Sequence, residues 1–285
     1  MKVVQSNLVG PDHIFRLRST TTATETDPHF QARVGFYFAI AQELAGMHSA
    51  WAKLSLPEAL RMGKTWMVLR TKLHVDRYTN WAEEVLGETW VEPPKGLHFM
   101  RCVRGLDEDG QTLFEGISTW AFMDLVNKRP IRPSEVADEF PLPQETDTRH
   151  VYPFELPHRA PMWETSGPRE LCSGSPVINL TDTDGNHHVN NLSYVAWSMN
   201  VLPHDFLMEY KVRDIDVSWI KQTFLEDEIT VHAGSVQENP FHQQQPELFF
   251  KIVRHEKDGS ETIVFEGYSQ WEKREKLTRD GLYTV

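Results

Sequence analysis

A seven-residue pattern occurs twice in this chain, as FEGISTW at Phe114–Trp120 and as FEGYSQW at Phe265–Trp271. Five of the seven positions are identical. Each copy follows an Asp-Gly pair, Asp109-Gly110 or Asp258-Gly259, and Asp-Gly between alternating apolar residues is typical of a β-hairpin. Because an internal repeat reflects a repeated structural unit, we predict two related halves that each end in a hairpin of two long strands.

Further strands and one helix precede each hairpin. Residues Trp66–Val75 and Asp214–Ile220 have the pattern of strands, and each is followed by an acidic turn and another strand. Upstream, apolar residues recur at helical spacing through Val34–Trp51, on nearly all faces, which predicts a buried helix. The second half has a shorter helical stripe, made of Leu192, Val195, Ala196 and Met199.

The shared order of a helix and then a meander of strands predicts an α+β tandem (double) hotdog, in which each antiparallel β-sheet is wrapped around a central α-helix. Between the halves the composition changes, since eight of the 17 prolines fall between Pro130 and Pro168. Proline interrupts strands and helices, so this stretch is expected to be a linker or an extended crossover. The expected domains are an N-terminal hotdog, residues 1–150, and a C-terminal hotdog, residues 151–285.

The formal net charge of −12 argues against nucleic acid as a partner, because phosphate binding requires clustered Lys and Arg. Two basic clusters, Arg61/Lys64 and Lys128/Arg129/Arg132, can still meet an acidic partner at short range. A solvated surface is the commoner fate of such charges.

The two cysteines, Cys102 and Cys172, are too few for a disulfide framework and form no Cys-x-x-Cys pair. We therefore expect a reducing, cytoplasmic location and no metal site. The longest apolar stretches are too short to span a membrane, and residues 1–15 lack the apolar core of a secretory signal. No cofactor is expected.

The segment Asp184–Asn191, with the sequence DGNHHVNN, lies where the second helix should begin. Asp and Asn are favoured at helix N-caps, so a purely structural role for Asp184 and Asn186 as caps is a serious alternative. Four side chains that can hydrogen-bond nevertheless crowd a helix start where one cap would suffice: Asn186, His188, Asn190 and Asn191. This surplus favours a functional site.

The corresponding place in the first half has the sequence DPHFQA, beginning at Asp27. Aligning Asp27 with Asp184 places Gln31 opposite His188. One half has kept the polar residues and the other has largely lost them. Such an asymmetry is expected when a fold is duplicated and only one of the two copies keeps a working site.

The pattern Asp-x-Asn-x-His-Val-Asn-Asn-x-x-Tyr, from Asp184 to Tyr194, resembles the motif of the plant and bacterial acyl-acyl carrier protein thioesterases. The first half also resembles that family, through Thr71–Val75, Trp81 and Ser118–Trp120. His-Val-Asn-Asn by itself is similar to a motif of single-hotdog acyl-CoA thioesterases, but its place within a tandem hotdog is more specific. The resemblance covers most of the chain.

This resemblance implies that Asp184, Asn186 and His188 are catalytic. The fourth residue of the family is a Glu on the strand after the helix, and Gln222 stands at that position here. Gln222 is included in the site because its amide can hold a water molecule, although it cannot accept a proton as Glu does. Some members carry a Cys beside that Glu, where this chain has Thr223.

Thioester hydrolysis needs an attacking water, a polarised carbonyl and a place for negative charge to develop. We expect backbone N–H groups near His188 and Val189 to face the thioester oxygen, with the Asn186 side chain as a further donor. His188 is expected to orient the water or accept its proton, while Asp184 is the second candidate base or positions its neighbours. Substrate binding is assigned to the remaining motif residues Val189, Asn190 and Asn191.

The acyl chain needs an apolar tunnel, and the resemblance implies that the first helix lines it in the N-terminal domain through Phe36, Phe38 and Trp51. Ordinary core packing explains each of these residues equally well. A covalent cysteine route is not expected, because neither Cys102 nor Cys172 has a base next to it in the sequence.

The leading expectation is therefore an acyl-acyl carrier protein hydrolase of fatty-acid biosynthesis, with acyl carrier protein as its partner. An acyl-CoA thioesterase is the alternative within the same reaction class, and the net charge does not separate the two. A hotdog dehydratase or hydratase fits the motif poorly. A non-catalytic acyl-binding protein stays open because of Gln222. The oligomeric state stays open as well, with a homodimer among the options.

Overall fold

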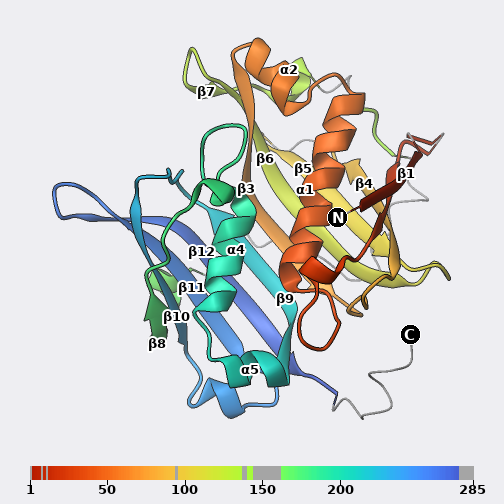
Figure 1. Cartoon of the computed structure of the whole chain (residues 1–285). Coiled ribbons are helices and arrows are strands. Elements are labelled where there is room, and N and C mark those ends of the chain that lie inside the picture. The colour runs from red at the N-terminus through yellow and green to blue at the C-terminus, as the bar shows by residue number, and fades with distance from the viewer. Residues whose placement is uncertain are drawn as a thin grey trace. The chain divides into compact units, whose positions relative to one another are not determined.

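The computed structural model describes residues 2–7, 9–10, 12–93, 96–136, 140–143 and 162–275. The chain forms two compact units, Met1–Glu155 and Leu156–Val285 (Figure 1). Among the described residues no helix is both long enough and apolar enough to cross a membrane.

The first unit is an antiparallel sheet with one long helix. Its strands follow the spatial order β1-β2-β4-β5-β6-β3, and a short β7 pairs with β6. The strands are β1 (Lys2–Asn7), β2 (Phe15–Thr20), β3 (Lys64–Val75), β4 (Glu84–Val91), β5 (Phe99–Leu106), β6 (Thr112–Asp124) and β7 (Arg129–Pro130). The helices are η1 (Ala23–Glu25), α1 (Val34–Trp51), α2 (Leu56–Arg61) and η2 (Pro133–Glu135).

The second unit has the same plan with fewer strands. Its sheet is also antiparallel, in the order β9-β12-β11-β10-β8. The strands are β8 (Arg169–Gly174), β9 (Tyr210–Trp219), β10 (Glu228–Ser235), β11 (Glu247–His255) and β12 (Glu261–Lys273). The helices are α3 (Trp163–Ser166), η4 (Leu180–Asp182), α4 (Asn191–Asn200), α5 (His204–Glu209) and η5 (Pro240–His242).

Both hairpins predicted from the Asp-Gly pairs are confirmed. Strand β5 pairs with β6 and strand β11 pairs with β12, each in antiparallel register. Gly110 and Gly259 lie in the turns with φ of 76° and 85°, a conformation that glycine adopts without steric cost. The predicted strands at Trp66–Val75 and Asp214–Ile220 correspond to β3 and β9.

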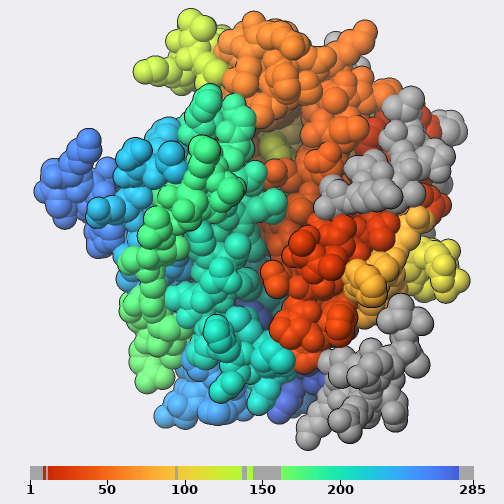
Figure 2. Space-filling model, viewed as in Figure 1, coloured from red at the N-terminus to blue at the C-terminus, as the bar shows by residue number. Residues whose placement is uncertain are grey.

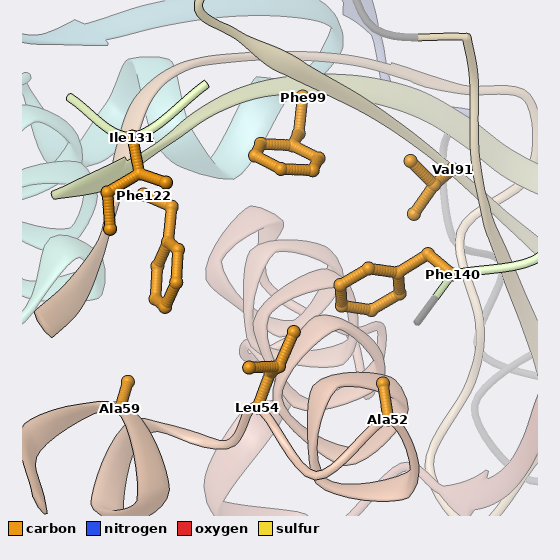
Figure 3. Close-up of a cluster of buried hydrophobic side chains, with 8 residues drawn as sticks. All are labelled: Ala52, Leu54, Ala59, Val91, Phe99, Phe122, Ile131 and Phe140. Atoms are coloured by element: carbon orange, nitrogen blue, oxygen red, sulfur yellow. The ribbon is translucent and has the colours of Figure 1, made fainter. Parts of the chain in front are cut away.

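Helix α1 lies directly on the sheet of the first unit (Figure 1). A Cβ atom on Gly87 of β4 would come within 2.9 Å of Leu44 Cδ1, which shows how closely the helix side chains approach this strand. Beyond the C-terminal end of α1, a cluster of apolar side chains closes the core (Figure 3). Within it Phe122 and the partly buried Trp66 stack with their ring centroids 4.4 Å apart.

Helix α4 presents a different face to its sheet than the apolar stripe predicts. Tyr194, Val195, Trp197 and Ser198 are buried, whereas Ala196 is exposed. The Tyr194 ring stacks on Phe265 of β12, with the ring centroids 5.6 Å apart. The large rings fill the space above the sheet, because burying them removes more apolar area from water than burying alanine.

Candidate functional site

The segment from Thr183 to Val189 forms a tight hairpin before α4. Thr183 and Val189 are paired as an antiparallel bridge, and the Asp184 N–H donates to the His188 carbonyl at 2.9 Å. The His187 N–H donates to the Asp184 carbonyl at 3.0 Å. His187 has a φ of 61°, in the left-handed region that closes such turns.

The first unit contains the same hairpin. The Asp27 N–H donates to the Gln31 carbonyl at 2.8 Å, and the Phe30 N–H donates to the Asp27 carbonyl at 3.0 Å. Phe30 has a φ of 58°, matching His187. The alignment of Asp27 with Asp184 is therefore confirmed, and Gln31 is the counterpart of His188.

The two hairpins differ in how their aspartate is used. Asp27 Oδ1 accepts the N–H groups of His29, at 2.9 Å, and of Gln31, at 3.2 Å. Asp184 Oδ1 accepts the Asn186 N–H at 2.8 Å. The His188 N–H has no hydrogen-bond acceptor among the residues that the structure describes. At this matched position the second unit thus leaves the His188 N–H unengaged, whereas the Gln31 N–H of the first unit is bonded to Asp27.

Val189 is buried, and its N–H donates to the Thr223 carbonyl at 2.9 Å. This finding corrects the expectation that the Val189 N–H faces a substrate, because that donor is already engaged within the fold. The bond instead ties the hairpin to the segment that follows β9. In the first unit the Ala32 N–H makes the equivalent bond to Thr79, at 2.8 Å.

Helix α4 begins one residue after Asn190, which is its N-cap. Asn190 Oδ1 accepts the Leu192 N–H at 2.9 Å, and Asn191 is the first helical residue. The alternative in which Asp184 and Asn186 cap the helix is therefore wrong. The capping role also gives the Asn190 side chain a structural function, whatever its contact with substrate.

Replacing Asn190 with alanine is expected to lower the free energy of unfolding by about 1 kcal/mol, the usual cost of removing an N-cap acceptor. Chemical denaturation followed by circular dichroism measures this change. Asn190→Ser keeps an acceptor and serves as the control. Equal stability of the alanine and serine variants would contradict the capping role.

His188 is half-buried between Asp184 and Phe224. The Phe224 ring lies edge-on to the imidazole, with the ring centroids 5.1 Å apart. Burial lowers the pKa of His188 below its usual value, the negative charge of Asp184 opposes this, and His187 lowers it further. The imidazole is therefore neutral at pH 7 and has a nitrogen free of its proton, as a general base requires.

Gln222 lies on the segment after β9, next to the Thr223 carbonyl that receives the Val189 N–H. Its side chain is exposed, and its backbone carbonyl accepts a hydrogen bond from Arg254 Nη1 at 2.6 Å. The Phe224 N–H donates to Asp227 Oδ2 at 2.8 Å and closes the turn. The segment that carries Gln222 is thus bonded directly to the hairpin that carries His188.

Two residues of this arrangement went unnoticed in the sequence, Phe224 and Arg254. Arg254 bonds the Gln222 carbonyl and lies 3.6 Å from Asp227, so it holds the turn in place from β11. Phe224 supplies the apolar wall beside His188. Neither has a local signal, because both act through neighbours distant in the chain.

The cysteines are poor nucleophiles where the structure places them. Cys102 is buried in β5, and burial raises the pKa of its thiol. Cys172 lies in β8, and burial again raises its pKa. A thiol that resists ionisation is unreactive, which supports a route through activated water.

Phe36, Phe38 and Trp51 do not form one continuous surface of α1. Phe36 and Phe38 are buried, and two residues along a helix correspond to a rotation of about 200°, so they point to opposite sides. Trp51 is 38% exposed and lies about 20 Å further along the helix. Among the residues that the structure describes, no cluster of His, Cys, Asp and Glu is arranged to hold a metal ion.

Comparison with known proteins covers both units. Residues 13–142 match the model of the acyl-ACP thioesterase N-terminal domain, and residues 176–273 match that of the C-terminal domain. A chloroplastic palmitoyl-acyl carrier protein thioesterase of Gossypium hirsutum is 26% identical over 231 residues, which are 78% of this chain and 54% of the relative. A relative of the same description from Arabidopsis thaliana is 25% identical with the same coverage. The chain thus spans about half the length of these curated relatives.

Solved structures share the fold. An acyl-ACP thioesterase from Bacteroides thetaiotaomicron superimposes with a TM-score of 0.75 at 19% identity, covering 92% of this chain and 99% of that one. A 12:0-ACP thioesterase from Umbellularia californica gives a TM-score of 0.70 at 17% identity, covering 92% and 98%. The predicted α+β tandem hotdog is confirmed. With matches to both of its domain models, this chain belongs to the acyl-ACP thioesterase family.

Proposed function

We propose that this protein hydrolyses the thioester of acyl-acyl carrier protein and releases a free fatty acid for fatty-acid biosynthesis. Membership of the family supports the reaction class. The observation that carries the proposal is the difference between the two hairpins. Among the residues that the structure describes, only the second hairpin combines an imidazole with an unengaged backbone N–H. His188 supplies both groups.

In the proposed mechanism, neutral His188 accepts a proton from water as the water oxygen bonds to the thioester carbonyl carbon. The carbonyl oxygen becomes negatively charged and is stabilised by the His188 N–H, with the Asn186 side chain as a second donor. The carbon–sulfur bond then breaks, and the protonated imidazole returns the proton to the leaving thiolate. The products are a carboxylic acid and the free thiol of the carrier.

Asp184 supports this cycle in two ways. Its Oδ1 accepts the Asn186 N–H at 2.8 Å, which shapes the hairpin. Its negative charge raises the pKa of His188 and so stabilises the imidazolium formed when water is deprotonated. We assign Gln222 to holding the attacking water through its amide, since it cannot act as a base.

Two other functions compete with this proposal. An acyl-CoA thioesterase would use the same residues on a different thiol, and a non-catalytic acyl-binding protein would bind acyl chains without releasing thiol. Gln222 in place of the family's Glu is the feature that favours the second of these. We further propose a cytoplasmic location, because both cysteines are free thiols.

The test is thiol release from matched series of acyl-carrier-protein and acyl-CoA thioesters of increasing chain length. Faster hydrolysis of the carrier-bound series supports the proposal. Equal or faster hydrolysis of acyl-CoA makes the chain an acyl-CoA thioesterase. Acyl binding without thiol release by wild type, together with hydrolysis by Gln222→Glu, makes it a binding protein with a disabled site.

The pH dependence of kcat/KM is expected to follow His188. Since burial lowers the pKa of this imidazole, the neutral form persists below pH 6.5, and activity is retained until the pH falls through the lowered value. Stopped-flow thiol detection between pH 4 and 8 measures the profile. An acidic limb above the ordinary histidine pKa would contradict a lowered pKa at the catalytic base.

A further inference from the structure

Two segments of the first unit, far apart in sequence, come together beside α2. The Leu125 N–H donates to the Gly63 carbonyl at 2.9 Å, and Lys64 pairs in register with Asp124. Val126 Cγ2 lies 3.5 Å from the position that a Cβ on Gly63 would occupy. The end of α2 and the turn between β6 and β7 therefore form one continuous surface (Figures 1 and 2).

This surface exposes large apolar side chains. Leu60 is 39% exposed, Met62 is 48% exposed and Val126 is 80% exposed. Their neighbours Ala59 and Phe122 are fully buried in the cluster of Figure 3, so the core is already closed beneath them. Contiguous exposed apolar area of this kind marks an interaction site on many proteins.

The same surface carries cations that form no close ion pair. Arg61, Lys128 and Arg129 are exposed, and none lies within 4 Å of a carboxylate among the described residues. The two nearby acids, Glu58 and Asp124, also accept hydrogen bonds in their own turns, and Arg61 and Arg129 stabilise their negative charges from beyond ion-pair distance. Asp124 accepts the N–H groups of Val126 and Asn127, both at 2.9 Å, and Glu58 accepts the Ser55 N–H in the capping box of α2.

Other arginines of the first unit form close ion pairs with carboxylates. Arg16 and Arg104 both bind Glu88, and Arg77 binds Glu83 and Asp107. The contrast matters because the chain carries a net charge of −12. Arg61, Lys128 and Arg129 outnumber the two nearby acids, so this surface keeps a positive charge on an acidic protein, and its field acts within about 8 Å at physiological salt.

We propose that this basic–apolar patch, made of Leu60, Arg61, Met62, Val126, Lys128 and Arg129, docks the acidic face of the carrier protein that delivers the acyl thioester. The identity of the partner rests on the proposed function. A small acidic protein needs to match only the patch, whereas an anionic membrane would also meet the negative charge of the rest of the chain. The cations speed encounter, and the apolar side chains give the contact its specificity.

The charge test compares the triple variant Arg61→Glu/Lys128→Glu/Arg129→Glu with Lys257→Glu, an exposed lysine in the hairpin turn of the second unit. With an acyl-carrier-protein substrate the triple variant is expected to lose at least about 10-fold in kcat/KM, mainly through KM. With acyl-pantetheine, which has the same thioester and no carrier protein, it is expected to match wild type. An equal loss on both substrates would show damage to the fold and overturn the proposal.

A second comparison tests the apolar part. Val126→Asp is expected to weaken carrier binding, whereas Val236→Asp, at an exposed valine of the second unit, is expected to leave binding unchanged. Fluorescence anisotropy of labelled carrier protein measures binding directly and does not depend on hydrolysis. If the protein hydrolyses no thioester but binds the carrier through this patch, the docking inference stands and the proposed function fails.

Co-sedimentation with vesicles of phosphatidylcholine and phosphatidylglycerol tests the alternative that the patch binds an anionic membrane. Vesicle binding that the triple variant loses, with carrier binding unchanged, would make the patch a membrane contact and overturn the proposal. Carrier binding that the triple variant retains at physiological salt would overturn it as well.

Discussion

Replacing His188 with alanine is expected to reduce kcat for thioester hydrolysis by roughly 100- to 10,000-fold, the usual contribution of a positioned acid–base group. The variant loses the neutral imidazole held against Phe224 but keeps the hairpin, because the hydrogen bonds of that hairpin are made by backbone groups and Asp184. Thiol release from an acyl-carrier-protein thioester measures the loss, and thermal unfolding checks that the fold is intact.

The neighbouring histidine is the matched control. His187 is exposed and has a φ of 61°, a conformation that asparagine tolerates, so His187→Asn should preserve both the turn and the activity. A His188→Ala variant that retains most of its activity would show that the base lies elsewhere. Asp184 would then be the remaining candidate.

Replacing Asp184 with asparagine is expected to reduce kcat by about 100-fold while leaving stability nearly unchanged. Asparagine keeps an oxygen acceptor for the Asn186 N–H, which Asp184 Oδ1 accepts at 2.8 Å, but it carries no charge. Because Asp184 raises the pKa of His188, the variant should have a lower His188 pKa and a weaker base.

Nuclear magnetic resonance of the histidine ring protons measures that pKa directly. Asp27→Asn makes the same change in the hairpin of the first unit, which has Gln31 in place of the histidine, and should leave activity unchanged. A higher pKa for His188 in Asp184→Asn would contradict the electrostatic role. A large loss of stability would instead assign Asp184 to the fold of the loop.

Local chemistry predicted much of the fold. The Asp-Gly turns, the alternating strands and the long apolar helix all follow from short-range patterns, and β5–β6, β11–β12 and α1 were found where these patterns place them. Helix α4 is an element in which the apolar pattern and the packing disagree. Its apolar spacing selects Ala196 for the buried face, but the packing of Tyr194 on Phe265 decides otherwise.

The site shows the same division. The sequence identified the polar motif at Asp184 and its equivalent at Asp27, and the structure shows that both segments form the same hairpin. The sequence also led us to expect a substrate contact for the Val189 N–H, but in the structure this N–H donates to the Thr223 carbonyl. A backbone donor carries no sequence signal of its own, since every residue except proline has one, and only the folded chain determines which donors are taken.

Periodicity, turn chemistry and residue identity are local properties, and they are enough to predict a duplicated α+β hotdog whose second half carries the polar motif. The cap that Asn190 gives α4 and the places of Phe224 and Arg254 around His188 emerge only from the folded chain, as does the lack of an acceptor for the His188 N–H among the described residues. These facts depend on which segments meet in space, and burial and hydrogen bonding between distant segments settle that.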